Sequence, residues 1–271
     1  MQYKKALLWM ILNLAAMTGS VRADQLHVLA AGSLREVIGE IGRRYQIQTG
    51  IEVRADFGPS GVLRERIANG EKADLFASAD MGHPLKLAPD GLAMRVDMFT
   101  RNALCAFARP KVGLTPANFL DRLLDPAVKL GTSTPKADPA GDYTWFMFHR
   151  ADGVHPGAFS ILDQKAQKIV GGAPQNTVPV KDPVVEAMTS GQVDVMIGYC
   201  SGRQRMLREL PDLSVVQVPN DIAAGPEYGL AILKGANPHA ADLALYILSP
   251  EGQQLFVQFG FAPVGLPKGE P

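Results

Sequence analysis

Short apolar runs alternate with longer amphipathic stretches along the first hundred residues of this chain. The apolar runs contain β-branched residues and are four to seven residues long, which is typical of strands, whereas the amphipathic stretches repeat their apolar positions every three or four residues, as helices do. This pattern predicts strands at residues 26–31, 51–57 and 74–77, with helices at residues 33–49 and 60–69. The order strand, helix, strand, helix, strand predicts a parallel sheet covered by helices.

A passage rich in proline and glycine, residues 82–91, precedes what we expect to be a second unit. Helices are predicted there at residues 116–124, 142–150, 158–170 and 183–190. Strands are predicted at residues 104–108, 128–131, 177–180, 193–199 and 213–218. A further strand at residues 228–233 is followed by helices at residues 239–248 and 250–259. The simplest fold that accommodates this order has two α/β units, each a mostly parallel sheet flanked by helices, with a cleft between them.

The first residues have the features of a secretion signal. Lys4 and Lys5 precede an apolar run at residues 6–17, and Val21-Arg22-Ala23 is a small-x-Ala cleavage signal. The run is shorter than the roughly 20 apolar residues that cross a bilayer. We therefore expect residues 1–23 to be removed and the mature chain to be periplasmic, with no membrane-spanning segment.

The net charge of the chain limits the classes of ligand that it is expected to bind. The chain has 27 basic and 27 acidic residues, and without residues 1–23 it keeps 24 basic against 27 acidic groups, a net charge of −3. Nucleic-acid binders normally carry a basic surplus, so we expect no such partner. Any anion that the chain binds is held by local donors rather than attracted by its overall charge.

The two cysteines, Cys105 and Cys200, lie 95 residues apart and have no metal-ligand spacing. In an oxidising compartment they can form a disulfide, and otherwise they are small buried hydrophobic residues. The sequence leaves both possibilities open.

Two strand-to-helix junctions have the composition of an anion site. Ser33 follows the first predicted strand and Ser60 follows the second, each at the predicted N-cap of a helix. In a parallel sheet both junctions lie at the carboxyl ends of neighbouring strands, where ligands bind, and a helix start offers unpaired N–H groups. Residues 138–143 open a third helix in the second unit. Serine is also a common cap without any ligand, and Ser33-Leu-Arg-Glu36 is a capping box, so the junctions alone do not decide the matter.

Catalytic motifs are incomplete. Ser60 lies in Gly58-Pro-Ser-Gly61, but a nucleophile elbow needs glycine where the chain has Val62. The five histidines form no HExxH pair, and neither GxGxxG nor a Walker motif occurs. Nothing in the sequence requires an enzyme.

Several segments together resemble one family. These are AAGSL at residues 30–34, FGPS at 57–60, ADLFASAD at 73–80, PAGDY at 139–143 and the stretch 189–199. The chain is similar in these segments to periplasmic molybdate-binding proteins of ABC importers, and the similarity extends over residues 26–264. The resemblance implies a two-lobed solute receptor that binds molybdate or tungstate, contains no cofactor, and carries molybdenum only as the bound oxyanion.

The resemblance also implies roles for individual residues. Ser33 and Ser60 would each donate a hydroxyl, Ala140 its backbone N–H, Tyr199 its phenol, and Lys181 a backbone N–H. Lys181 stands where the family carries an apolar residue, so its ammonium group either faces water or adds charge to the site. A site made only of donors should reject protonated anions such as phosphate, because a buried donor without a partner costs about 1–3 kcal/mol.

The lobe boundaries follow from the same resemblance. We expect residues 24–103 to form lobe I, residues 104–227 lobe II, and residues 228–271 to return to lobe I with the C-terminal helices and a loose tail. The protein would be a monomer whose two lobes close by a hinge. It would deliver the anion to an ABC permease in the inner membrane.

Three alternatives remain open. The first is a receptor for another oxyanion or a small organic anion. The second is an exported serine hydrolase that uses Ser60 with a histidine. The third is a metal receptor that uses Tyr199 and Tyr228 with a carboxylate.

Overall fold

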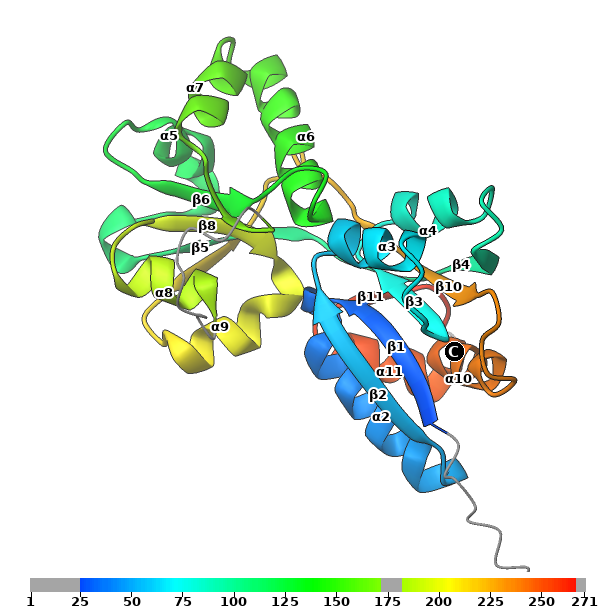
Figure 1. The fold of residues 1–271 in the computed structure, drawn as a ribbon. Coiled ribbons are helices and arrows are strands. Elements are labelled where there is room, and N and C mark those ends of the chain that lie inside the picture. Colours follow the sequence, from blue (N-terminus) through cyan, green and yellow to red (C-terminus); the bar gives the residue numbers. More distant parts are fainter. Residues whose placement is uncertain (1–24, 172–181, 267–271) are drawn as a thin grey trace, which may run out of the picture.

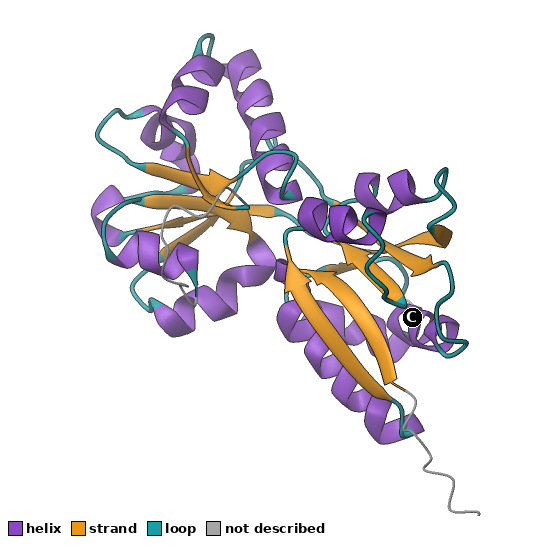
Figure 2. Ribbon diagram, in the orientation of Figure 1, coloured by secondary structure: helices purple, strands orange, loops and turns teal. Residues whose placement is uncertain are grey.

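The chain folds into two units, each built around one β-sheet (Figures 1 and 2). The structure is a computed structural model in which residues 25–171 and 182–266 are described. Figure 1 shows the two sheets side by side, each with helices on both faces. The α/β class with two sheets flanked by helices, predicted above, is therefore confirmed.

The larger sheet has six strands in the order β11-β4-β10-β3-β1-β2. Its strands are β1 (Gln25–Ala31), β2 (Glu52–Gly58), β3 (Leu75–Ser78), β4 (Ala93–Arg101), β10 (Glu227–Leu233) and β11 (Ala262–Pro263). Its helices are the 3-10 turn η1 (Gly32–Leu34), α2 (Arg35–Thr49), α3 (Ser60–Ala68), α4 (Gly82–Leu87), α10 (Ala240–Leu248) and α11 (Pro250–Gln258). Helices α3 and α4 cover one face and α2, α10 and α11 the other (Figure 1).

Strand β1 shows why this sheet is buried on both faces. Val28 packs in the cluster that includes helix α2, whereas its neighbour Leu29 packs in the cluster that includes Leu63 and Ile67 of α3. Successive side chains of a strand point to opposite faces, so an uninterrupted apolar strand supplies both cores.

The smaller sheet has five strands in the order β7-β6-β8-β5-β9. Its strands are β5 (Leu104–Ala108), β6 (Leu130–Ser133), β7 (Gln167–Val170), β8 (Val195–Tyr199) and β9 (Ser214–Gln217). Its helices are α5 (Phe119–Leu124), α6 (Pro139–Val154), α7 (Ala158–Lys165), α8 (Pro183–Thr189) and α9 (Arg203–Glu209), with 3-10 turns η2 (Pro110–Val112), η3 (Pro116–Asn118) and η4 (Cys200–Gly202).

Both sheets are mixed rather than mostly parallel. Strand β1 runs parallel to β2 and β3, but β10 is antiparallel to β3 and β4. In the smaller sheet β6 is parallel to β7 and β8, whereas β5 is antiparallel to β8 and β9. Strands β5, β10 and β11 form the antiparallel pairs, and β5 and β10 each enter their sheet directly after the chain passes from one unit to the other.

The chain crosses between the units twice, from β4 to β5 and from β9 to β10. Asn102, in the first crossing, donates its side-chain N–H groups to Ser201 Oγ at 2.8 Å and to Tyr228 Oη at 3.0 Å. The rings of Tyr199 in β8 and Tyr228 in β10 lie 5.5 Å apart between centroids. These contacts join the two units beside the crossings.

One predicted helix is wrong, and one predicted strand lies outside the described residues. Residues 158–170 are not one helix: α7 ends at Lys165, Ala166 adopts an extended backbone, and β7 pairs in parallel with β6. The predicted strand at residues 177–180 lies outside the described residues. The cysteines are joined as the disulfide Cys105–Cys200, which links β5 to the turn that follows β8.

Candidate functional site

A cleft of about 820 Å³ lies between the two units. The larger unit lines it with residues at the ends of β1, β2 and β3, namely Ala31, Gly32, Ser33, Gly58, Pro59 and Ala79. The smaller unit contributes Ser133 from the end of β6, Asp138 and Ala140 from the start of α6, and Gly198, Tyr199 and Ser201 from the end of β8. The carboxyl ends of strands from both sheets thus meet at one cleft, which is where ligands of α/β proteins bind.

Ser33 lies in the wall of the cleft, but it is not a helix cap. The N-cap of the 3-10 turn is Ala31, and no side chain caps either η1 or α2, so the predicted capping box does not form. Instead Ser33 Oγ lies 3.1 Å from Tyr228 Oη in a shared hydrogen bond. The serine hydroxyl is therefore placed by an aromatic residue of β10 and not by its own helix.

Ser60 lies behind the cleft wall. It is the first residue of α3, whose N-cap is Pro59, so its predicted position is wrong by one residue. The residue is fully buried, and its Oγ accepts a hydrogen bond from Ala79 N–H at 3.0 Å. Pro59 and Gly58, rather than Ser60, form the cleft surface at this junction. Ser60 holds the turn after β3 against α3.

The start of helix α6 is occupied by its own cap. Asp138 is the N-cap and Pro139 the first helical residue, a common pairing because proline lacks the N–H that a helix start leaves unpaired. Asp138 Oδ1 accepts the N–H of Ala140 at 3.0 Å. The backbone donor predicted to hold a ligand is thus paired with a carboxylate that also lines the cleft.

Asp138 gives the cleft an acceptor that the sequence analysis did not foresee. Burial raises the pKa of its carboxyl to about 6, against hydrogen bonds from Ala140 N–H and Ser133 that lower it, while the nearby charges of Asp142 and Asp80 raise it further. The group is still mostly ionised at slightly alkaline pH. The cleft lining therefore contains an acceptor beside the donors that the resemblance implied.

Tyr199 supplies a phenol hydroxyl from the smaller unit. The residue is 8% exposed, and its Oη donates to the carbonyl of Ala79 across the cleft at 3.4 Å. Burial raises the pKa of this phenol well above its usual value, so the hydroxyl keeps its proton at all ordinary pH values and remains a donor. The long contact to Ala79 leaves that donor available for a stronger acceptor.

The two units also touch beside the cleft. Gly61 N–H, in the first turn of α3, donates to the carbonyl of Ala137 at 3.0 Å. A Cβ atom at Gly61 would lie 2.4 Å from the carbonyl oxygen of Lys136 and 2.8 Å from that of Ala137. Only glycine permits this approach, because real Cβ atoms do not come so close to backbone oxygen.

Charged side chains around the cleft are mostly paired. Arg205 forms an ion pair with Asp182, and Arg35 lies over the ring of Phe57 at 4.6 Å. Glu36 pairs with Arg208 of the other unit. The lining carries five carboxylates, Glu36, Asp138, Asp182, Glu186 and Glu209, against the arginines Arg35 and Arg205. The lining therefore has more acidic than basic side chains and offers no surplus positive charge.

The geometry gives little support to a serine hydrolase at Ser60 or to a metal site at Tyr228. Among the described residues, Ser60 Oγ is bonded to Ala79 N–H and to no histidine, so no catalytic pair is formed there. Tyr228 Oη is bonded to Ser33 and Asn102. Lys181 lies outside the described residues, and its predicted role stays a prediction.

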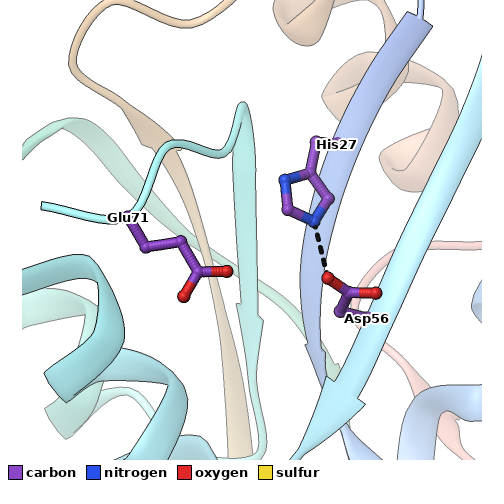
Figure 3. A group of neighbouring side chains, drawn as sticks. All are labelled: His27, Asp56 and Glu71. Carbon is purple, nitrogen blue, oxygen red and sulfur yellow. Dashed lines mark hydrogen bonds and ion pairs between the residues drawn. The ribbon is translucent and has the colours of Figure 1, made fainter.

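A second polar cluster lies away from the cleft (Figure 3). His27, Asp56 and Glu71 each offer a ligand atom within 4.8 Å of the others. His27 Nε2 is 3.0 Å from Asp56 Oδ2, and its Nδ1 is 3.0 Å from the carbonyl oxygen of Lys72. Arg66 binds both oxygens of Glu71 and lowers the pKa of that carboxyl. His27 is paired with Asp56, and the guanidinium group of Arg66 already supplies a positive charge to Glu71.

Asp138, Ser133 and Ala79 line the cleft but were not predicted as site residues, and Tyr228, which supports Ser33, was considered only as a metal ligand. Asp138 carried a usable signal, since Asp-Pro before an apolar run marks a helix start. The other three carried none, because they act through packing that a single sequence does not reveal.

Comparison with known proteins identifies what this architecture resembles. Residues 26–262 match the bacterial extracellular solute-binding proteins. An uncharacterized protein of Pasteurella multocida is 36% identical over 88% of this chain and 98% of its own length. The molybdate-binding protein ModA of Escherichia coli is 26% identical over 91% of this chain and 93% of its own length. The sulfate-binding protein SubI of Mycobacterium tuberculosis superposes with a TM-score of 0.73 at 16% identity, covering 89% of this chain and 87% of its own.

Within residues 25–171 and 182–266 no helix combines the length and the apolar character that crossing a bilayer requires.

Proposed function

Because this chain belongs to the bacterial extracellular solute-binding proteins, we propose that it is the receptor of an ABC importer and delivers an oxyanion to a permease in the inner membrane. The relatives that it matches are binding proteins rather than enzymes, which supports a function in capture and delivery without covalent chemistry. Removal of residues 1–23 would leave a monomeric periplasmic protein.

The proposal that the ligand is an oxyanion rests on the groups that line the cleft. The carboxyl ends of β1 and β8 and the start of α6 converge on a single cleft and bring to its walls the Ser33 and Tyr199 hydroxyls and Ala140, whose N–H is held by Asp138 in this structure. Hydroxyl groups and helix-start N–H groups bind anions without any positively charged side chain. This arrangement suits a small oxyanion that loses its water on binding.

Molybdate and tungstate are the first ligands to consider. The similarity to the E. coli molybdate-binding protein supports them, as do Ser33, Ala140 and Tyr199, which line the cleft as the resemblance implied. Ser60 would reach the ligand only if the Ala79 turn moved, because its hydroxyl is turned to that turn in this structure. Lys181 would complete the set through its backbone N–H.

Binding would be accompanied by closure of the two units. Residues 24–103 and 228–271 would form one lobe and residues 104–227 the other, with the crossings at β4–β5 and β9–β10 as the hinge. The cleft volume of about 820 Å³ greatly exceeds that of one tetrahedral oxyanion, so closure would be needed to surround it.

A second candidate ligand is an oxyanion that keeps a proton, or a small organic anion with a hydroxyl group. Asp138 favours it, since a carboxylate in the wall accepts a hydrogen bond that a fully ionised anion cannot donate. The cleft volume also admits an organic ligand of modest size.

Calorimetric titration of the mature chain tests the proposal. Molybdate, tungstate, sulfate and phosphate would each be added to protein freed of bound anions by unfolding and refolding. Stoichiometric binding of at least one of the four supports an oxyanion receptor, and tight binding of molybdate or tungstate with weak sulfate supports the first candidate. If none of the four binds, the proposed ligand class is wrong and organic solutes become the next ligands to test.

A further inference from the structure

Asp138 both caps a helix and lines the cleft. It caps helix α6 through Oδ1, which accepts the Ala140 N–H, and it lines the cleft where that N–H is expected to meet a ligand. An anion that approaches the start of α6 therefore meets a carboxylate as well as the backbone donors.

We propose that Asp138 determines which oxyanion the cleft accepts, by receiving a hydrogen bond from a proton that the ligand itself carries. The preferred ligand class is then an oxyanion that keeps a proton near neutral pH, such as hydrogen phosphate, rather than one that is fully ionised, such as sulfate. This inference rests on the proposed function, because it assumes that the cleft binds an oxyanion.

The groups around Asp138 explain why a ligand that carries a proton would bind better beside its carboxylate than one that does not. The nearby charges of Asp80 and Asp142 raise the pKa of the Asp138 carboxyl, and the charge of Asp138 in turn raises the pKa of the Tyr199 and Tyr228 phenols. None of these four groups is a cation that would neutralise it. Its remaining partners are the hydroxyl of Ser133 and the N–H of Ala140.

A ligand oxygen without a proton would place two acceptors opposite each other. Neither could satisfy the other, and their charges would repel in a cleft from which water is excluded. A ligand O–H turns the same contact into a hydrogen bond between a neutral donor and a charged acceptor, which is among the stronger kinds. Sulfate and hydrogen phosphate have almost the same size and shape, so this contact separates them.

Helix capping alone does not explain why the residue is acidic. Asparagine caps helices about as well as aspartate, and it would leave the cleft without a charge. A second carboxylate in the same turn, that of Asp142, accepts the N–H of Lys136 at 2.9 Å and does not line the cleft. Asp142 is therefore a matched control for Asp138, since both are acidic groups at the start of α6.

The test compares phosphate and sulfate on three proteins. Wild type, Asp138→Asn and Asp142→Asn would be titrated calorimetrically with each anion at about pH 8, where a carboxyl with a pKa of about 6 is ionised and inorganic phosphate still carries one proton. We expect wild type and Asp142→Asn to bind phosphate at least ten-fold more tightly than sulfate. Asp138→Asn should lose that preference, with sulfate, molybdate and tungstate gaining at least ten-fold.

The outcomes separate this inference from the proposed function. Equal or stronger binding of sulfate by wild type, or an unchanged ratio in Asp138→Asn, overturns the role of Asp138 while the oxyanion receptor stands. Absence of binding by all four anions to folded wild type overturns both. If the melting temperature shows that Asp138→Asn does not fold, Asp138→Ser, which also caps helices, takes its place with the same expected loss of preference.

Discussion

Tyr199 offers the most direct test of the cleft at the scale of a single residue. Replacing it with phenylalanine removes one hydroxyl donor while the ring keeps its contact with Tyr228, 5.5 Å away between centroids. A hydrogen bond to a charged group is worth about 1.5–3 kcal/mol, so we expect anion affinity to fall by about ten- to a hundred-fold. Calorimetry measures the affinity, and thermal unfolding checks that the fold is kept.

Tyr246→Phe is the matched control for that substitution. Tyr246 lies in α10 and is half-buried, its hydroxyl donates to Glu251 of the same unit, and it does not line the cleft. Loss of its hydroxyl should leave affinity unchanged. Equal affinities in wild type and Tyr199→Phe would remove Tyr199 from the binding site.

His83 gives a prediction about pH. The residue is 5% exposed, and among the described residues neither ring nitrogen has a hydrogen-bond partner, although Nε2 lies 3.9 Å from Asp80 Oδ2. Burial lowers the pKa of the imidazole, the charges of Arg64 and Lys86 lower it further, and Asp80 and Asp142 oppose this. The unfolded chain therefore binds a proton at a higher pH than the folded protein does.

The sign of the pH effect follows from that difference. Stability is intact above the unfolded pKa of about 6.5 and falls as the pH drops from there toward the lower folded value. Melting curves at about pH 7.5 and 5.5 should show a drop for wild type that is smaller in His83→Leu. Identical drops in the two proteins would contradict the assignment.

At this scale the sequence predicted some of the residues that line the cleft and not others. Ser33, Ala140 and Tyr199 do line one cleft, because each follows directly on a strand end or helix start that the pattern predicts. Ser60 does not line the cleft, because its side chain is fully buried and its Oγ accepts the N–H of Ala79. The sequence predicts that Asp138 begins a helix. It does not predict that the carboxylate also lines the cleft, because an Asp-Pro pair looks the same in both cases.

Elements were predictable where burial gives a strong pattern. Strands β1, β3, β5, β8 and β10 are apolar on nearly every residue and were found. Strand β4 was missed because its exposed Met94 and Arg95 break the alternation that marks a half-buried strand. Helix α9 buries only Met206, so it has no apolar stripe to detect. The antiparallel entry of β5 and β10 depends on the chain crossings, which no local pattern encodes.

The disulfide is the element-scale contact with the largest expected effect on stability. It joins Cys105 in β5 to Cys200, the residue after Tyr199, across 95 residues of chain. A crosslink over a loop of that length restricts the unfolded chain and stabilises the folded one by about 4 kcal/mol. Replacing both cysteines with serine should lower the free energy of unfolding by about that amount in urea titrations.

Reductant provides the control for the disulfide. Treatment of wild type should move its unfolding midpoint toward that of the double variant, and the variant itself should not respond. Equal midpoints for oxidised wild type and the double variant would show that the crosslink adds no net stability.

At the scale of the whole molecule, the two units are held by a few contacts of unequal weight. The Glu36–Arg208 pair joins α2 to α9, but its side chains are 32% and 59% exposed, and such pairs contribute less than about 1 kcal/mol. The hydrogen bond from Tyr199 to Ala79 is long. The Gly61–Ala137 contact is short, is made by backbone groups, and tolerates no side chain, so it limits how closely the units approach.

Gly61→Ala should therefore weaken binding without unfolding either unit. The added Cβ would lie 2.4 Å from the Lys136 carbonyl oxygen, so the units must separate to accommodate it, whereas the helix itself favours alanine. If the population of the closed arrangement falls to about a tenth, the apparent affinity falls about ten-fold. Small-angle scattering should show a larger radius of gyration in the presence of ligand than wild type has.

Gly39→Ala makes the same substitution in helix α2, where a Cβ meets nothing within 4 Å. It should bind as wild type does, with an unchanged or slightly higher melting temperature. If Gly61→Ala also binds as wild type does, the contact between α3 and the Lys136–Ala137 backbone is not part of the ligand-bound arrangement. Closure would then have to depend on the crossings and on the ligand itself, because no other contact described between the units is equally intolerant of an added atom.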